Sequence, residues 1–277
     1  MPDEALGWPR GRREPRADAV PCSMDPDLVE QALTGGNAST GVVRVGDTVR
    51  RPSGPWTGNV DALLRHLERV GFTGAPRALG RDEQGRQVLE YVPGQVNVPP
   101  SRLDLAALSR VGQLIRDLHD AAATFVPPAD ARWNVLVRPD ADDQICHHDL
   151  APWNLVLGSD RWVFIDWDTA APGSRGWDLA YALHGFVPLS ASAGRSDAEA
   201  VSRVRALVDG YGLDEAGRRR LVPLLARRTF AMYDLLRHGH DKGIVPWNRL
   251  WDEGHGAAWS ASTHYIEERR ELWERAL

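Results

Sequence analysis

One short stretch of the chain limits the possible folds more than any other, the sequence ICHHDLAPWNLVL at positions 145–157. Pro152 rules out a continuous helix there, because proline lacks a backbone N–H and clashes with the preceding turn. The polar centre of the stretch is also too dense for a single buried strand. We therefore predict a loop between two strands, which would direct Asp149 and Asn154 into a common space.

A further carboxylate follows this loop. Positions 163–165 form a short apolar run typical of a buried strand, and Asp166 stands at its end. Together, Asp149, Asn154 and Asp166 offer two carboxylates and an amide. These oxygen donors suit Mg²⁺, which takes water and phosphate as its remaining ligands. The donor set indicates phosphoryl transfer.

The composition narrows the class of protein. The chain has 277 residues, of which 43% are hydrophobic, so it can bury a core in one large domain or two lobes. The net charge of −5 argues against a nucleic-acid partner, and no apolar stretch is long enough for a membrane span. Two cysteines are too few for a disulfide framework or a cysteine zinc site, and they fit a reducing cytoplasm.

The first 24 residues are expected to form a disordered tail. They are rich in Pro, Gly and Arg, and their charges cancel. No apolar run follows the arginine pair at positions 12 and 13, so neither a Sec nor a twin-arginine signal is expected. Folding is expected to begin near Asp25 with a short helix over 25–33.

Strand signals dominate positions 25–94, which we predict to form an N-terminal lobe. A Gly-rich turn at 34–40 leads into a hairpin whose tight turn is at Gly46 and Asp47. Two more short strands flank a turn at 83–86. A helix separates the two strand pairs, and its predicted apolar face consists of Val60, Leu63, Leu64, Leu67 and Val70.

Helix signals dominate the rest of the chain. Positions 95–100 are rich in proline and polar residues, which is typical of a connector between lobes. The C-terminal lobe, 101–277, is predicted to begin with a long helix and to be mainly helical again after Trp177. The apolar stripe of its first helix consists of Leu105, Leu108, Val111, Leu114, Ile115 and Leu118.

The order of these features resembles the protein-kinase-like fold, in which a Gly-rich turn, a basic strand residue, a helix, a hinge, an H-x-D-x-x-x-x-N loop and a strand-end aspartate follow one another. The closest resemblance is to the aminoglycoside phosphotransferase and choline kinase-like family. HHDLAPWN matches its catalytic loop, and FIDWDTA followed by WDLA matches its metal-binding strand and the next helix. The resemblance implies a two-lobed α+β fold, with a small antiparallel-sheet N-lobe and a mainly helical C-lobe.

The resemblance also implies a function. The protein would be a Mg²⁺-dependent kinase that transfers the γ-phosphoryl group of ATP or GTP to a hydroxyl of a small molecule, such as an aminoglycoside or another antibiotic. Asp149 would orient the hydroxyl and take its proton, while Asn154 and Asp166 would hold the metal ions. Positioning and charge neutralisation are what such a transfer requires of a protein.

Four other polar residues in or near the loop are expected to support it or to bind metal rather than to act in catalysis. By resemblance, His147 supports the loop backbone, and Asp178 holds that backbone from the next helix. His148 stands where the family often has glycine, and we interpret both histidines as hydrogen-bonded structural residues rather than metal ligands. Asp168 is either a further metal ligand or a loop cap.

The nucleotide side departs from the family pattern. Kinase-like enzymes place a lysine on the third strand, yet Lys242 is the only lysine here, so the role must pass to arginine. Arg50 and Arg51 are both candidates. Strand alternation favours Arg51, whose planar group can hold phosphate oxygens bidentately. The glutamate that normally pairs with this residue is missing from its expected place, where Asp61 is the nearest acid.

Other nucleotide contacts are predicted in two places. Gly36, Asn37 and Ser39 could offer backbone N–H groups and a hydroxyl to phosphate. By family resemblance, the backbone from Glu90 to Val92 would contact the base.

Two alternative functions come from other classes. His148 and Asp149 could form the dyad of an HD-type metal phosphohydrolase, but such dyads lie within helices, which Pro152 opposes. A kinase-like binding protein without activity is the other alternative. It would be expected to lack at least one of Asp149, Asn154 and Asp166, and all three are present.

Overall fold

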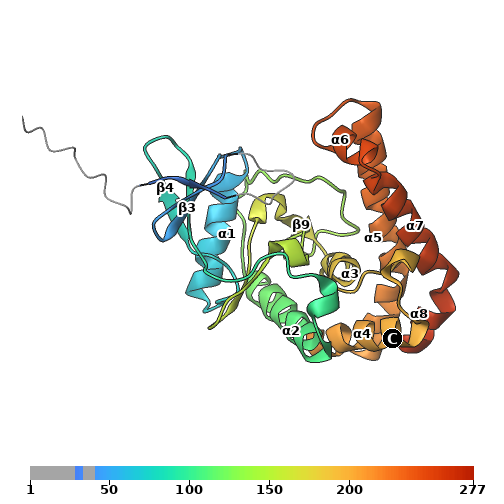
Figure 1. Ribbon diagram of the computed structural model, residues 1–277. Helices are drawn as coiled ribbons and strands as arrows, with labels where there is room; N and C mark the ends of the chain where they lie inside the picture. The colour runs from blue at the N-terminus through green and yellow to red at the C-terminus, as the bar shows by residue number, and fades with distance from the viewer. Residues whose placement is uncertain (1–28, 34–40) are drawn as a thin grey trace, which may run out of the picture.

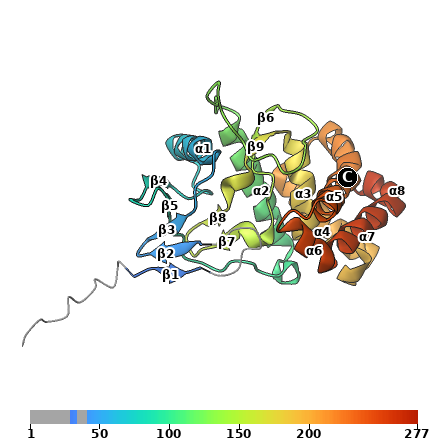
Figure 2. The ribbon, with the colours of Figure 1, turned by 90° about the horizontal axis from the view of Figure 1, so that it is seen from above.

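The structure is a computed structural model that describes residues 29–33 and 41–277. A small sheet with one helix lies at one end of the molecule, and the later helices gather at the other end (Figures 1 and 2). Within the described residues, no helix is both long and apolar enough to cross a membrane. The predicted α+β fold with two lobes is confirmed. The exact lobe boundaries, at 25–94, 95–100 and 101–277, stay a prediction.

The N-terminal lobe contains a five-stranded antiparallel sheet with the strand order β1-β2-β3-β5-β4. Its strands are β1 (Gln31–Ala32), β2 (Val43–Val45), β3 (Thr48–Arg51), β4 (Ala78–Arg81) and β5 (Gln87–Glu90). The predicted hairpin is confirmed, because Val45 pairs with Thr48 across the turn. Gly46 has a φ of 55°, which favours glycine at this turn.

The helix predicted over 25–33 is wrong for the part that the structure describes. Gln31 and Ala32 pair with β2, and the Leu33 N–H donates to the Val42 carbonyl at 3.0 Å. An isolated helix of nine residues has marginal stability in water. The open edge of β2 offers these residues backbone hydrogen-bond partners instead. The beginning of the predicted helix and the Gly-rich turn at 34–40 lie outside the described residues.

Helix α1 (Thr57–Arg69) carries the predicted apolar face, with one exception. Val60, Leu63, Leu64 and Leu67 are buried in the core. Val70 is 48% exposed because the helix ends before it, and Gly71 turns the chain away with a φ of 83°. The prediction that Val70 belongs to the buried face is therefore wrong.

The C-terminal lobe starts after the connector with a short 3-10 turn, η2 (Pro100–Arg102), and with α2 (Leu105–Ala122). Asp104 caps α2 by accepting a hydrogen bond of 2.7 Å from the Ala107 N–H. Of the predicted apolar stripe of α2, Leu105 is 48% exposed and Leu114 is half-buried. The fully packed members are Leu108, Val111, Ile115 and Leu118.

The stretch at 145–157 is a loop between strands, as predicted. Two small antiparallel sheets, β6 with β9 and β7 with β8, surround it. Its elements are β6 (Gln144–Cys146), η3 (Pro152–Asn154), β7 (Leu155–Leu157), β8 (Trp162–Phe164), η4 (Trp167–Thr169) and β9 (Ala171–Gly173). Strand β8 ends one residue earlier than predicted, so Ile165 separates it from Asp166.

The remaining helices pack behind the loop, and α2 packs along α4. Helix α5 contacts α3, α6 and α7 and so forms the centre of this layer. These elements are α3 (Arg175–Phe186), η5 (Ala191–Ala193), α4 (Asp197–Tyr211), α5 (Glu215–Asp241), α6 (Trp247–Asp252), α7 (His255–Glu268) and α8 (Arg270–Ala276).

Candidate active site

Asp149 and Asn154 meet within the loop. The Asn154 side-chain amide donates hydrogen bonds to Asp149 Oδ2 at 2.6 Å and to the Asp149 carbonyl at 2.9 Å. A carboxylate only accepts hydrogen bonds, so the amide nitrogen must face Asp149, and the amide oxygen is left for another donor or a cation. Burial raises the pKa of the Asp149 carboxyl, although hydrogen bonds from Tyr181 and Asn154 oppose the rise.

Asp178 of α3 holds the backbone of this loop. Its two carboxylate oxygens accept hydrogen bonds from the His147 N–H at 3.0 Å and from the His148 N–H at 2.8 Å. Burial alone would raise the pKa of Asp178, but the hydrogen bond from His119 and its charge hold that pKa well below its usual value. Asp178 therefore acts as a buried anion that fixes the loop, which is the role predicted for it.

Both histidines are structural, as predicted. The His147 Nδ1 accepts a hydrogen bond of 3.3 Å from the Asp149 N–H, so its Nε2 carries the proton and donates to the Ile165 carbonyl at 3.1 Å. The His148 Nε2 lies 3.1 Å from the Ala171 and Pro172 carbonyls of β9. With these three ring nitrogens engaged, the imidazoles support the loop.

Arg51 joins the two lobes at the acidic end of β8. Its Nη2 donates hydrogen bonds to Asp166 Oδ1 at 2.9 Å and to Asp168 Oδ2 at 2.6 Å. The backbone of Asp166 has a φ of 62°, which is rare outside glycine and often found at functional sites. Burial raises the pKa of Asp168, and the nearby Asp166 charge adds to this rise while Arg51 opposes it.

The neighbouring Arg50 points elsewhere, which agrees with the predicted facing of the strand. Its guanidinium donates to the Thr48 hydroxyl at 2.5 Å and lies 3.7 Å from Asp82. Asp61 of α1, the acid nearest to the expected partner position, accepts a hydrogen bond of 2.6 Å from Gln87 and lies 3.4 Å from Arg81. Asp166 and Asp168 are thus acidic partners of Arg51.

The residues predicted to contact the nucleotide base lie between the lobes. Glu90 ends β5, and its N–H donates to the Arg77 carbonyl at 3.0 Å. Its carboxylate accepts a hydrogen bond of 2.6 Å from Arg161. Val92 follows the strand and is half-buried. Gly36, Asn37 and Ser39, the predicted phosphate contacts, lie outside the described residues.

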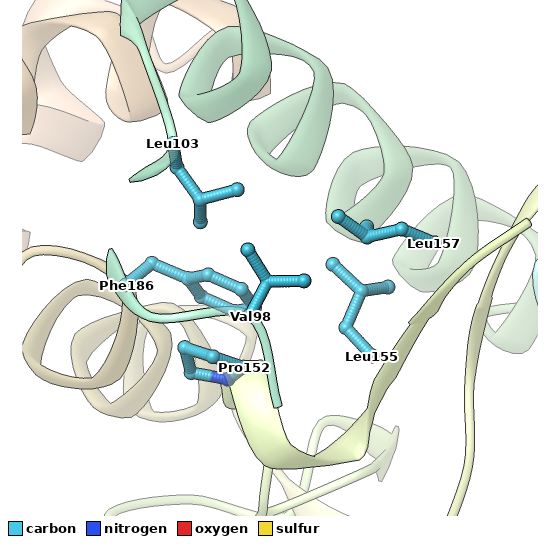
Figure 3. A pocket seen from close by; sticks show the side chains of 6 residues that line it. All are labelled: Val98, Leu103, Pro152, Leu155, Leu157 and Phe186. Atoms are coloured by element: carbon cyan, nitrogen blue, oxygen red, sulfur yellow. The ribbon is translucent and has the colours of Figure 1, made fainter. Parts of the chain in front are cut away.

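An apolar crevice supports the loop from behind (Figure 3). Side chains from the connector, the end of η2, the loop, β7 and α3 converge on it, namely Val98, Leu103, Pro152, Leu155, Leu157 and Phe186. Because side chains alternate along a strand, Val156 lies on the opposite face of β7 from Leu155 and Leu157. This packing, together with Asp178, gives the loop a rigid base.

Comparison with known proteins agrees with this arrangement. The family model described as "Phosphotransferase enzyme family" matches residues 129–224, a range that contains the loop, Asp166 and Asp178. The trifolitoxin immunity protein of Rhizobium leguminosarum bv. trifolii is 35% identical over 261 residues, which are 90% of this chain and 98% of that protein. The chain belongs to the phosphotransferase enzyme family.

Solved structures show that this phosphotransferase has a kinase-like fold. A choline/ethanolamine kinase family protein from Mesorhizobium loti matches with a TM-score of 0.60 and 18% identity, over 93% of this chain and 96% of that one. Amicoumacin kinase, whose structure contains AMP-PNP and Ca²⁺, matches with a TM-score of 0.62 and 14% identity, over 88% and 89% of the two chains.

The arrangement of Asp166 and Asp168 fits a divalent cation. Asp166 Oδ1 and Asp168 Oδ2 both lie within 3 Å of one nitrogen of Arg51, so these two like-charged oxygens converge on a single point. Two negative charges this close are stabilised by a cation, and carboxylate and amide oxygens are the donors that Mg²⁺ prefers. Asp166, Asp168 and the Asn154 amide oxygen are therefore suited to hold the metal.

Three residues of the site were not identified from the sequence. His119 of α2 lies 3.2 Å from Asp178 and 2.8 Å from the Tyr211 hydroxyl. Tyr181 lies one helical turn after Asp178, and its hydroxyl interacts with the Asp149 carboxylate and lowers its pKa. That helical spacing was the only available signal for Tyr181. Arg228 of α5 contacts the loop from 80 residues away, a distance over which no local pattern connects the two.

Proposed function

We propose that the protein transfers the γ-phosphoryl group of ATP or GTP, with Mg²⁺, to a hydroxyl of a small molecule. The observation that carries this proposal is the link from Arg51 in the N-terminal sheet to Asp166 and Asp168 in the C-terminal lobe. This link joins the Arg51 guanidinium of the N-terminal sheet to two carboxylates of the C-terminal lobe. It supports a role for Arg51 in binding phosphate and for the two carboxylates in binding metal, with the nucleotide between the lobes.

Asp149 is the proposed proton acceptor. In the reaction, the acceptor oxygen forms a bond to the γ-phosphorus, the bond from that phosphorus to the β,γ-bridging oxygen breaks, and the acceptor proton passes to Asp149. The Asn154 amide holds the carboxylate in one orientation, at 2.6 Å, so that its second oxygen is available to the acceptor hydroxyl. A positioned base of this kind typically contributes about 10² to 10⁴ in rate.

The remaining roles concern the nucleotide. Asn154 and Asp166, with Asp168 as a third donor, hold the metal, which neutralises charge on the phosphates when it is bound. Arg51 holds phosphate oxygens in place of the usual lysine, and Gly36, Asn37 and Ser39, which precede β2 in the sequence, are the other proposed phosphate contacts. The backbone from Glu90 to Val92 contacts the base.

An antibiotic is the proposed class of acceptor. One relative carries a name that denotes immunity to trifolitoxin, and one structural neighbour is a kinase of amicoumacin. The acceptors to be tested therefore include both aminoglycosides and other antibiotics.

The proposal is tested by a nucleotide-consumption screen. Purified protein with Mg²⁺ and either ATP or GTP is incubated with a panel of antibiotics and hydroxylated metabolites, and the product is identified by mass spectrometry as the acceptor plus one phosphate group. Asp149→Ala is expected to lower turnover by about 10² or more, whereas Asp160→Ala, an exposed carboxylate in the turn after β7, is the matched control.

Three outcomes would contradict the proposal. Near-wild-type turnover by folded Asp149→Ala would remove Asp149 from the chemistry. Nucleotide binding without transfer to any acceptor would favour the inactive binding protein. Release of phosphate from an ester without a nucleotide donor would favour the phosphohydrolase, which the position of His148 and Asp149 in a loop rather than a helix opposes.

A further inference from the structure

Arg228 is a buried cation beside the Asp149 loop. It lies on α5, its side chain is almost fully buried, and its Nη2 donates a hydrogen bond of 3.0 Å to the His148 carbonyl. Its Nε and Nη1 have no hydrogen-bond partner among the residues that the structure describes. Burying a charged guanidinium costs free energy unless contacts with neighbouring groups compensate it.

The peptide plane that Arg228 contacts is the one that carries Asp149. The His148 carbonyl accepts from Arg228, while the Asp149 N–H at the other end of the same peptide donates to His147 at 3.3 Å. His148 itself has a φ of 67°, a left-handed backbone that a non-glycine residue rarely adopts. The Arg228 contact therefore helps to hold an unfavourable backbone turn immediately before Asp149.

The same guanidinium also contacts the tyrosine that touches Asp149. The Arg228 Cζ lies 4.2 Å from the ring centroid of Tyr181 and 5.4 Å from that of Trp177, both on the face of α3 that packs against α5. The tyrosine ring also stacks on Trp259 of α7, with centroids 6.1 Å apart and planes 15° apart. The Tyr181 hydroxyl interacts with the Asp149 carboxylate and lowers the pKa of that group, although burial keeps the pKa raised overall.

We propose that Arg228 and Tyr181 act as one unit that positions Asp149, with Arg228 fixing its backbone through the His148 carbonyl and Tyr181 fixing its carboxylate. This role rests on the proposed function, in which Asp149 receives the acceptor proton. The two residues touch neither nucleotide nor acceptor in this scheme and are positioning residues. Their effect is on the orientation of a base whose other carboxylate contact comes from Asn154.

The test uses three variants at the two positions. Tyr181→Phe removes the hydroxyl and keeps the stacked ring. Arg228→Met keeps most of the side-chain length and removes the guanidinium, and Arg228→Lys keeps the charge and a hydrogen-bond donor group. The matched control is Tyr265→Phe, because Arg269 lies 4.0 Å from the Tyr265 ring in a similar pair that packs near Trp273 of α8.

Two measurements are made on folded, full-length protein. With an acceptor from the screen, kcat is expected to fall about tenfold or more in Tyr181→Phe and Arg228→Met while the nucleotide KM is unchanged, because each loses a contact to the loop but none to the nucleotide. The kcat of Arg228→Lys should lie between those of Arg228→Met and wild type, and the kcat of Tyr265→Phe should stay within twofold of wild type. The double variant Tyr181→Phe/Arg228→Met should have a kcat no lower than that of the less active single variant. Amide hydrogen exchange at 147–151 should be faster in Arg228→Met than in wild type.

The hydrogen-exchange measurement separates this proposal from the proposed function. If the wild-type protein phosphorylates no hydroxyl, the proposed function fails, and the exchange rate of the loop still decides whether Arg228 holds it. A wild-type exchange rate in Arg228→Met would overturn the positioning role, as would kcat values within twofold of wild type in both single variants. If Arg228→Met does not fold, Arg228→Lys and Tyr181→Phe are judged by the same criteria.

Discussion

Arg51 of β3 donates a hydrogen bond of 2.6 Å to Asp168, a residue that follows it by 117 positions in the chain. The same nitrogen lies 2.9 Å from Asp166. The cation proposed for the phosphates is therefore paired with the carboxylates proposed for the metal. Since the same guanidinium is hydrogen-bonded to both acids, a metal that binds without nucleotide must compete with Arg51 for them.

The first prediction is that replacing Arg51 changes metal and nucleotide affinity in opposite directions. Arg51→Gln removes the competing charge, so Mn²⁺ or Mg²⁺ alone should bind more tightly. ATP should bind more weakly, by roughly tenfold or more, because a charge-assisted contact contributes about 1.5 to 3 kcal/mol. Isothermal titration calorimetry with the metal alone and with ATP measures both affinities.

Arg50→Gln is the control for this prediction, since Arg50 contacts Thr48 and Asp82 instead of the acids at the end of β8. It should leave both affinities near their wild-type values. Equal effects of the two variants, or weaker metal binding in Arg51→Gln, would contradict the competition.

The sequence predicted this site where the chemistry is local and less well where it is not. Pro152 and the polar residues around it were sufficient to identify the loop, and strand alternation distinguished Arg51 from Arg50. The acidic partners of Arg51 were not predicted, because they come from an element 115 and 117 positions away. Arg228 was missed because it lies 80 positions from the loop that it contacts. Its spacing on α5 is also that of an ordinary core-facing residue.

The errors in the predicted fold have a similar cause. The periodicity of residues 25–33 suits a short helix, yet the open edge of β2 recruits Gln31 and Ala32 into the sheet. Val70 continues the apolar spacing of α1 but lies beyond its last residue. Local patterns therefore identified most elements, whereas competition from neighbouring elements decided where some of them begin and end.

The second prediction concerns Asp178. Asp178→Asn replaces one accepting oxygen with an N–H₂ group that faces a backbone N–H, so at least one buried hydrogen bond to His147, His148 or His119 is lost. We expect the free energy of unfolding to fall by about 2 to 4 kcal/mol, since the lost contacts are buried and charge-assisted. Urea denaturation monitored by circular dichroism measures this loss.

Asp117→Asn provides the comparison for Asp178, because Asp117 is exposed on α2. This substitution should change the free energy of unfolding by no more than about 0.5 kcal/mol, as for most surface substitutions. If Asp178→Asn were as stable as Asp117→Asn, the anchoring of the loop by Asp178 would be refuted.

The third prediction is a loss of stability in mild acid that depends on His184. Burial, assisted by the charge of Arg228, lowers the pKa of His184 from 6.5 to about 4. Above pH 6.5 the side chain is neutral in both folded and unfolded protein, so it does not lower the free energy of unfolding there. As the pH falls from 6.5 towards 4, the unfolded chain takes up the proton first, so stability decreases, by about 2 kcal/mol at pH 5.

His184→Phe should remove this dependence while keeping the stacked contact with Trp259, whose ring centroid lies 4.3 Å away. The free energy of unfolding at pH 7 and pH 5 should therefore differ less in His184→Phe than in wild type. His264→Gln, at a 73% exposed side chain on α7, should retain the wild-type difference. An unchanged difference in His184→Phe would show that His184 does not contribute to acid sensitivity.

The fourth prediction concerns the contact between α2 and α4, which supports the helix that carries His119. A Cβ atom on Gly112 would lie 2.0 Å from the Leu207 carbonyl oxygen, and one on Gly210 would lie 2.0 Å from the Ser109 carbonyl oxygen. Neither backbone can move without separating the helices, so Gly112→Ala should lower the free energy of unfolding by about 1 to 3 kcal/mol or more.

Gly58→Ala is the matched control, since Gly58 also lies in a helix and a Cβ there meets nothing within 4 Å. That substitution should stabilise the protein by about 0.4 to 1 kcal/mol. Thermal and urea unfolding of both variants should therefore shift in opposite directions, and a stabilised Gly112→Ala would mean that α2 and α4 do not approach as closely as the structure has them.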